Sequence, residues 1–178
     1  MVAGSAAVCG ATARPSAVMP PGAVSFERFR TACTACGLCI SSCPQGVLAP
    51  AGVWAYGPAG TLMPRLDFRR GACDPACHRC AEVCPARALV RYSAEERPKV
   101  KIGLAVWDRA ACHTTAGETC TLCRDRCPAE AIRLVADTPD GVPHPVVDAD
   151  KCVGCGRCEN YCPAEGRAIR VRLVTLPR

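Results

Sequence analysis

The stretch that decides the fold is Cys152-Val153-Gly154-Cys155-Gly156-Arg157-Cys158-Glu159-Asn160-Tyr161-Cys162-Pro163. Three cysteines fall within seven residues, and a fourth follows after three more residues, directly before a proline. Four thiolates at this spacing are the ligand pattern of a [4Fe–4S] cluster. Gly154 and Gly156 allow the backbone to curl around such a cluster and to point its amides at sulfur.

The same motif occurs three more times in the chain, each time closed by Cys-Pro. The second copy has one extra residue in its first gap, and the third has a seven-residue first gap. The first cysteines lie 40, 39 and 40 residues apart, which marks an internal repeat. These motifs use 16 of the 17 cysteines and leave only Cys9. We predict four [4Fe–4S] clusters, with iron bound by Cys33, Cys36, Cys39, Cys43, Cys73, Cys77, Cys80, Cys84, Cys112, Cys120, Cys123, Cys127, Cys152, Cys155, Cys158 and Cys162.

Two other uses of cysteine compete with this interpretation. A secreted disulfide scaffold would also be rich in cysteine, but such frameworks join distant strands, whereas these cysteines are grouped locally. Zinc sites usually pair two Cys-x-x-Cys units or include histidine, and this chain has only three histidines. The pattern therefore favours iron–sulfur clusters, although the long gap of the third motif leaves open a distorted or lost cluster there.

The composition leaves little material for an apolar core, because only eight aromatic residues are present. Metal clusters can staple such a small chain, so their removal should unfold it. The formal charge of +6 counts the cysteines as neutral. Each oxidised cluster with four thiolates contributes roughly −2, which brings the total to about −2 and removes the support for a nucleic-acid partner. The many arginines beside the motifs either offset cluster charge and form docking patches or make a solvated face.

The sequence predicts an α+β, loop-rich chain. A helical turn is expected between the third and fourth cysteine of each motif. Strands are expected over Lys99–Trp107, with Val100, Ile102, Leu104 and Val106 on one face, and over Pro145–Asp148 and Ala168–Leu173. The expected domains are a disordered tail or signal-peptide remnant over 1–23, the first pair of motifs over 24–95 and the second pair over 96–178.

The first residues carry a signal-like pattern. Val2 to Ala13 is small and apolar and ends in Ala11-Thr12-Ala13, an A-x-A-type cleavage pattern, but it lacks a charged start and twin arginines. It is either the end of a longer signal peptide or a disordered tail, and we expect no role for Cys9. No run approaches the length of a transmembrane helix.

Three segments resemble the NapG/MauM-like ferredoxin-type proteins. They are Ile102 to Asp108, the stretched third motif with Gly117 before Cys120-Thr121-Leu122-Cys123, and His144 to Cys152. The segment Leu66 to Cys73 is closer to the related NapF-like ferredoxins. The resemblance covers roughly residues 14 to 175, and the long gap in the third motif belongs to the family pattern.

The resemblance implies tandem ferredoxin-like units of the bacterial 2[4Fe–4S] type in two pseudo-symmetric halves. It also implies electron transfer on the periplasmic side, from a membrane ferredoxin-type quinol-oxidising partner to a reductase or cytochrome; a cytoplasmic location is the alternative. In two-cluster ferredoxins the fourth cysteine of each motif ligates the other motif's cluster. Resembling four-cluster subunits usually nest their motifs, so we expect the first motif to pair with the fourth and the second with the third, while sequential pairing stays open. Nesting would join Cys162 to Cys33, Cys36 and Cys39; Cys43 to Cys152, Cys155 and Cys158; Cys127 to Cys73, Cys77 and Cys80; and Cys84 to Cys112, Cys120 and Cys123.

The chain shows no nucleotide loop, catalytic triad or carboxylate pair, and all-thiolate coordination leaves no iron open to a substrate. The sequence therefore predicts an electron carrier and not an enzyme. Two rivals remain: a maturation or insertion factor for a metalloenzyme, and a zinc-binding structural module. The sequence does not identify donor, acceptor or reduction potentials.

Overall fold

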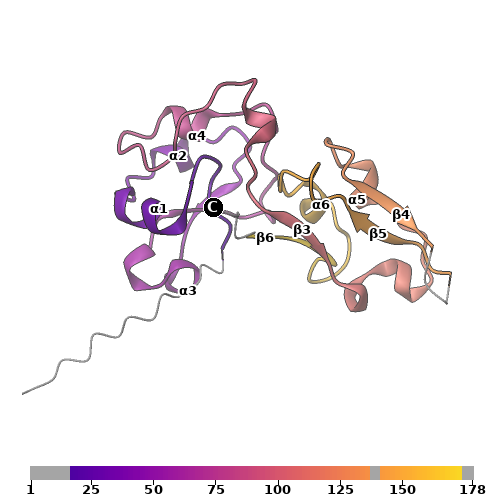
Figure 1. The fold of residues 1–178 in the computed structure, drawn as a ribbon. Coiled ribbons are helices and arrows are strands. Elements are labelled where there is room, and N and C mark those ends of the chain that lie inside the picture. The colour runs from indigo at the N-terminus through magenta and orange to yellow at the C-terminus, as the bar shows by residue number, and fades with distance from the viewer. Residues whose placement is uncertain (1–16, 137–140, 174–178) are drawn as a thin grey trace, which may run out of the picture.

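The computed structural model describes residues 17–136 and 141–173, so the signal-like stretch and Cys9 lie outside the described residues. Figure 1 shows two small lobes side by side, one from the indigo and magenta first half and one from the orange and yellow second half. Short helices and two-stranded sheets are joined by long loops, in agreement with the predicted α+β, loop-rich chain. None of the described helices is both long and apolar enough to cross a lipid bilayer.

Four one-turn helices occupy the same place in the four motifs. Each begins one residue before the third cysteine, and they are α2 (Leu38–Ser41), α4 (Arg79–Glu82), α5 (Leu122–Asp125) and α6 (Arg157–Asn160). The predicted helical turn is therefore present in every motif. Helices this short are not stable alone, so packing and the bound clusters must hold them in place.

The remaining helical elements lie in the loops and at the start of the first half. The longest, α1 (Phe26–Ala32), is capped by Ser25, whose hydroxyl accepts a hydrogen bond from the Arg28 amide at 3.2 Å, and it buries Phe29. The others are α3 (Val53–Tyr56) and the 3₁₀ turns η1 (Pro58–Gly60), η2 (Arg97–Lys99), η3 (Arg109–Ala111) and η4 (His113–Ala116).

Three antiparallel two-stranded sheets are described. β1 (Leu48–Pro50) pairs with β2 (Pro64–Leu66), β3 (Leu104–Trp107) with β6 (Ile169–Arg172), and β4 (Ile132–Val135) with β5 (His144–Val147). The first half thus holds one sheet and the second half two, so the halves are not copies of each other at this level. The strand predicted over Ala168–Leu173 is confirmed as β6, in which Ile169 and Val171 are buried while Arg170 and Arg172 are exposed.

The observed strand β3 is shorter than the strand predicted over Lys99–Trp107. The side chain that it buries also lies on the face opposite to the predicted apolar one. Lys99 ends the 3₁₀ turn η2, and the Ile102 amide donates to the Val153 carbonyl at 2.9 Å instead of joining the sheet. Within β3, Ala105 is buried and Val106 is exposed. The reason is that Ala105 lines a neighbouring cavity formed by cysteines, so its side chain points inward and that of Val106 points outward.

The tail expected over residues 1–23 is also too long. Val18 is buried, its carbonyl accepts from the Leu66 amide at 2.8 Å, and the Gly22 carbonyl accepts from the Val90 amide at 2.9 Å. Residues 17–23 therefore belong to the first half.

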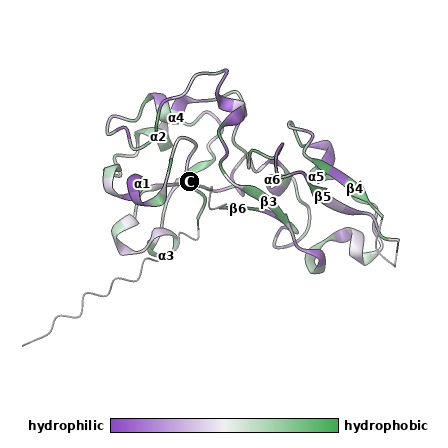
Figure 2. Cartoon of the chain, viewed as in Figure 1, coloured by the Kyte–Doolittle hydropathy of each residue, from purple (hydrophilic) through white to green (hydrophobic). Residues whose placement is uncertain are grey.

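Each half has its own apolar core, and motif cysteines are part of both. The first core contains Phe29, Met63, Phe68 and Cys73, and it extends to Ile102 and Val171 from the second half. The second contains Ala105, Ile132, Cys152 and Ile169. Figure 2 shows the hydrophobic residues in short green patches along the strands, separated by hydrophilic loops. Cores this thin agree with the expectation that clusters complete them.

Candidate iron–sulfur centres

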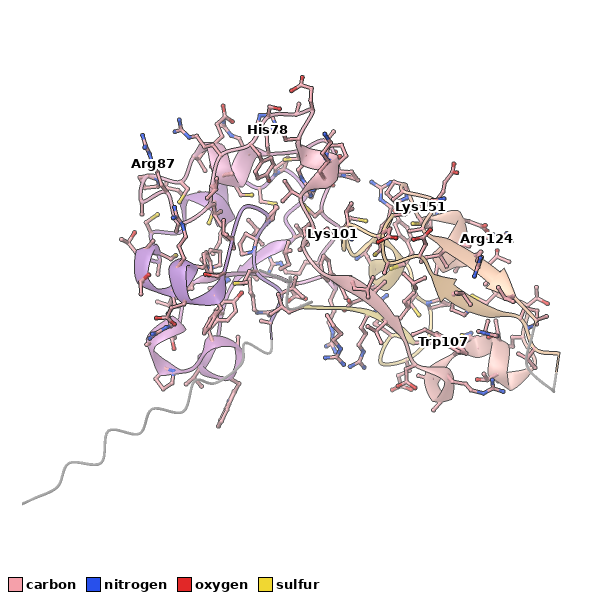
Figure 3. All side chains as sticks on the ribbon, viewed as in Figure 1. His78, Arg87, Lys101, Trp107, Arg124 and Lys151 are labelled. Carbon is pink, nitrogen blue, oxygen red and sulfur yellow. The ribbon has the colours of Figure 1, made fainter. Side chains whose placement is uncertain are left out.

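Four cavities in the structure are each lined by four cysteines. We name them by the motif that supplies three of the four. The first cysteine pocket has Cys33, Cys36, Cys39 and Cys84; the second has Cys73, Cys77, Cys80 and Cys43; the third has Cys112, Cys120, Cys123 and Cys162; and the fourth has Cys152, Cys155, Cys158 and Cys127. All sixteen predicted cysteines are accounted for, and none of them forms a disulfide. Sulfur atoms gather inside both lobes (Figure 3).

This grouping overturns the nested pairing. The fourth cysteine of each motif does cross to another motif, but the exchange is between the first and second motifs and between the third and fourth. The physical reason is local packing, because α2 contacts α4 and α5 contacts α6. Each helix carries the third cysteine of its motif and leads directly into the fourth.

The turn after the fourth cysteine repeats in the first three motifs. The amide three residues on donates to that cysteine's carbonyl, from Gly46 to Cys43, from Arg87 to Cys84 and from Glu130 to Cys127. All three donors have positive φ, between 47° and 59°. Only glycine adopts this conformation without strain, so Arg87 and Glu130 are held in it by the surrounding fold. The turn after Cys-Pro therefore has the same conformation in these three motifs, and it directs the fourth cysteine toward the partner motif.

The first and fourth motifs also share their backbone conformation between the cysteines. The residue before the second cysteine, Ala35 or Gly154, has φ of 52° or 72°, and the residue after it, Gly37 or Gly156, has φ of 77° or 76°. The predicted role of Gly154 and Gly156 in curling the loop is therefore confirmed.

The long gap of the third motif folds into a compact turn. η4 occupies His113–Ala116 and ends at Gly117, which has φ of +85°. Thr114 is buried, and its hydroxyl lies 3.2 Å from the Cys112 sulfur. The extra residues therefore leave Cys112 beside Cys120 and Cys123, and the third pocket keeps its four cysteines.

Burial keeps several of the pocket thiols protonated when no metal is bound. It raises the pKa of Cys39, Cys73 and Cys123 to about 11 and that of Cys80 to about 12, and neighbouring thiols in the same pockets add to the rise for Cys39, Cys80 and Cys123. Backbone amides act in the opposite direction, for example Ala35 at Cys33 and Arg157 at Cys155. Because only thiolates bind iron, the metal must displace these protons, and its charge then offsets the four sulfurs.

One cysteine has a guanidinium beside it. Arg97 donates from Nη2 to the Cys73 sulfur at 3.2 Å and from Nε to the Cys77 carbonyl at 2.9 Å. Its charge lowers the pKa of Cys73, although burial outweighs it and leaves the net shift upward. Nothing in the sequence spacing pointed to this residue, because it lies 13 residues beyond the second motif.

The two halves meet through the second and fourth motifs. The Cys73 amide donates to the Cys155 carbonyl at 2.8 Å, and the Asn160 side chain donates to the Phe68 carbonyl at 2.7 Å. Gly156 lies against the Phe68 ring so closely that a Cβ would overlap it. Within the second half, Lys101 donates to the Ala149 carbonyl at 2.8 Å (Figure 3). A ligand of the second pocket is thus hydrogen-bonded directly to a ligand of the fourth.

Several histidine and aromatic side chains near the motifs have described partners other than the motif cysteines. His113 lines the third pocket, and its Nδ1 lies 2.9 Å from a Glu118 carboxylate oxygen. Trp107 stacks on His144 with ring centroids 5.1 Å apart and lines the third pocket. Tyr161 is 45% exposed with the Arg126 guanidinium over its ring. Trp54 is 92% exposed, so it covers no cluster.

Part of the arginine excess gathers at the junction of the halves. A cavity of about 430 Å³ is lined there by Arg65, Arg69, Arg167, Arg170 and Arg172. Arg65 is paired with Asp67 at 3.0 Å, and Arg167 donates to the carbonyls of Glu159, Asn160 and Cys162. These bonds stay within one half each, so the arginines give the junction positive charge while each is held by its own half.

Comparison with known proteins identifies iron–sulfur domains in both halves. Residues 28–49 match the 4Fe–4S binding domain, and residues 118–165 match the 4Fe–4S dicluster domain. The methylamine utilization ferredoxin-type protein MauM of Methylorubrum extorquens is 38% identical over 172 residues, covering 93% of this chain and 75% of that protein. The ferredoxin-type protein NapG of Escherichia coli K12 is 36% identical over 179 residues, covering 94% and 76%. The ferredoxin-type protein NapF of the same organism is 28% identical over 146 residues, covering 82% and 80%.

Proposed function

The chain belongs to the family of ferredoxin-type iron–sulfur proteins that includes MauM and NapG, and from that premise we propose that it relays single electrons through four [4Fe–4S] clusters. The observation that carries this proposal is the set of four cavities, each lined by three cysteines of one motif and the fourth of its partner. When bound, each cluster takes up and returns one electron. In this role the sixteen cysteines hold the iron, and the described residues need no substrate site of their own.

The donor set fits a cluster better than a single zinc ion. Four thiols face each cavity, whereas zinc needs its four ligands within about 2.3 Å of one point. In the described part of the chain, no three Cys, His, Asp or Glu side chains converge closely enough to hold one ion. The pockets therefore suit a group with several irons, and this supports the electron-carrier proposal over the zinc-module alternative.

The order of the clusters along the relay follows from the contacts between pockets. The first and second pockets touch through α2 and α4, and the third and fourth touch through α5 and α6. The bond from Cys73 to Cys155 joins the second pocket to the fourth. The relay therefore runs first, second, fourth, third. The outer pockets, first and third, are the points at which an electron enters and leaves.

We assign the partners by the family's implied role. The donor is a membrane ferredoxin-type quinol-oxidising protein, and the acceptor is a reductase or cytochrome on the periplasmic side. The rival role, a maturation factor for a metalloenzyme, requires binding of an apo-enzyme and no fast electron transfer. Stopped-flow reduction and reoxidation separate the two, because a relay must load and unload faster than partner turnover and a maturation factor need not.

The first experiment counts metal. Anaerobically purified protein should contain about sixteen irons and sixteen sulfides per chain and, after dithionite, show spin-coupled [4Fe–4S] EPR signals. An iron content of about twelve per chain would mean that the relay has three clusters instead of four. Zinc in place of iron would refute the electron-carrier function.

A second experiment tests which cysteines share a cluster. Cys36→Ser and Cys84→Ser should alter the same EPR signal, and Cys77→Ser and Cys43→Ser should alter a different one. In the second half, Cys120→Ser and Cys162→Ser should likewise agree. If Cys84→Ser instead resembles Cys120→Ser, the pairing of motifs is nested and the proposed ligand sets are wrong.

A further inference from the structure

Arg97 is a charged side chain with no exposed surface. A buried guanidinium is costly unless a negative group compensates it. Its described partners are the Cys73 sulfur at 3.2 Å, the Cys77 carbonyl at 2.9 Å and the Val100 carbonyl at 3.4 Å, and no carboxylate is bonded to it among the residues that the structure describes. Its counter-charge must therefore come from the second cysteine pocket, to which Cys73 and Cys77 both belong.

The backbone around Arg97 holds this side chain in place. The Ser93 amide donates to the Glu96 carboxylate at 2.8 Å, and the Glu96 amide donates to the Ser93 hydroxyl at 3.3 Å, a reciprocal pair typical of a capping box. The Arg97 amide then donates to the Ser93 carbonyl at 3.0 Å and begins η2. The guanidinium is thus aimed at Cys73 by a closed turn, and its three contacts leave it little freedom to leave the sulfur.

We infer that Arg97 raises the reduction potential of the cluster in the second pocket above those of the other three clusters, so that the first electron taken up by the chain is held at the junction of the halves. This inference rests on the proposed electron-carrier function. Uptake of one electron makes the pocket one charge more negative, and a guanidinium that donates directly to a ligand sulfur stabilises that charge. The guanidinium donates a hydrogen bond and transfers no proton, so the step takes up one electron alone.

Other charges near the pockets act less strongly. Asp74 also lines the second pocket and opposes Arg97, but its carboxylate is partly exposed and already accepts from the Ala76 amide. Arg79 lines the same pocket, but it is half exposed and paired with Glu82 at 2.9 Å. Arg124 in the third motif is paired with Asp125. Water screens these exposed groups, whereas the buried contact of Arg97 acts in a lower dielectric.

The decisive experiment is a potentiometric EPR measurement on the anaerobic four-cluster protein, with the second cluster's signal identified by Cys77→Ser. In the unsubstituted protein, this signal should have the highest midpoint potential of the four. Arg97→Gln should lower this midpoint potential by at least 59 mV, which corresponds to a tenfold change in the equilibrium constant for one-electron reduction. Arg97→Lys should restore most of the loss, because it keeps the charge. Arg79→Gln, the matched control, should shift the same midpoint by less than half as much.

The inference would be overturned if Arg97→Gln folds, binds all four clusters and leaves the midpoint potential of the second cluster unchanged. It would also be overturned if another cluster of the unsubstituted protein has the highest midpoint potential. If Arg97→Gln fails to assemble, the unsubstituted protein supplies the test. With ¹⁵N-labelled arginine, pulsed EPR should detect nitrogen coupling at the reduced second cluster, and Arg97→Lys should abolish it. Absence of that coupling would also overturn the inference. A chain that shows the coupling and the potential shift but passes no electron to a partner would refute the proposed function and leave the role of Arg97 standing.

Discussion

At the scale of single residues, Gly156 links the conformation of the fourth motif to the junction of the halves. Its φ of +76° disfavours any side chain, and a Cβ there would overlap the Phe68 ring. Gly156→Ala should therefore cost about 1 kcal/mol for the left-handed backbone and about 1 to 3 kcal/mol for overpacking. We expect a lower Tm and loss of iron from the fourth pocket, measured by thermal unfolding and metal analysis.

Gly117 provides the matched control for this prediction. It has a similar φ of +85°, but no heavy atom would lie within 4 Å of a Cβ built on it. Gly117→Ala should therefore show only the backbone cost of about 1 kcal/mol. Equal destabilisation by both substitutions would show that contact with Phe68 contributes nothing. Gly156→Ala combined with Phe68→Ala should show coupling in a double-mutant cycle.

At the scale of elements, α1 is held by a side-chain cap that the other described α-helices lack. The Ser25 hydroxyl accepts from the Arg28 amide, and the helix delivers Phe29 to the first core beside Tyr56. Ser25→Ala should destabilise the holoprotein by about 1 kcal/mol, seen as a lower Tm with unchanged iron content.

Ser41→Ala is the control for the cap, because the Ser41 hydroxyl donates within α2 to the Leu38 carbonyl and satisfies no helix-terminal amide. Its effect should stay within about 0.5 kcal/mol, as for most exposed substitutions. If Ser41→Ala costs as much as Ser25→Ala, capping is not what stabilises α1.

Elements inside the motifs could be predicted from the sequence, and those that contact other parts of the chain could not. The cysteine spacing located the one-turn helices to within two residues, because ligand geometry leaves the backbone few choices. The burial of Ala105 in place of Val106 depends on the fourth pocket, which lies 47 residues further along the chain at Cys152. The Arg97 contact was missed for the same reason, since a long-range partner leaves no local signal.

The pairing of motifs also lies beyond what the spacing can decide. The turns after Cys43 and Cys84 have the same hydrogen bond and are compatible with nested or sequential pairing of the motifs. Only the packing of α2 on α4 selects sequential pairing. The sixteen cysteines could therefore be chosen from the sequence, while their division into four sets required the fold.

At the scale of the whole molecule, the bound clusters supply stability that the two small apolar cores do not provide alone. The described helices have at most seven residues and each sheet has two strands, so no element is stable alone. Removing iron with a chelator and an oxidant should unfold both halves, seen as loss of far-UV circular dichroism and of native amide protection. Reconstitution with iron and sulfide should restore the signal. Apoprotein that keeps its native protection would show that the apolar cores suffice.

Reconstitution of the apoprotein with iron and sulfide should depend on pH. The unfolded apoprotein buries the pocket thiols again as it refolds around iron, and burial raises the pKa of Cys39, Cys80 and Cys123, so protons compete with iron for these sulfurs during reconstitution. Reconstitution should therefore become more complete as the pH rises from 6 to about 9, measured as iron bound per chain at fixed free iron and sulfide. A yield that is flat or falls over this range would contradict the competition between protons and iron.

The proposed relay also requires that the halves stay in contact, and Asn160 provides the means to test this. Its side chain bridges to the Phe68 carbonyl of the other half at 2.7 Å, next to the bonds from Cys73 to Cys155 and from Ile102 to Val153. Asn160→Ala should cost about 1 kcal/mol and loosen this junction. Amide exchange at Cys73 and Ile102 should then accelerate, while exchange in the β4–β5 sheet, at the far end of the second half in Figure 1, should not change. Spin coupling between the second and fourth clusters should weaken in parallel. If exchange rises equally in β4–β5, the substitution destabilises the second half as a whole, and the junction is not an independent contact through which the electron passes.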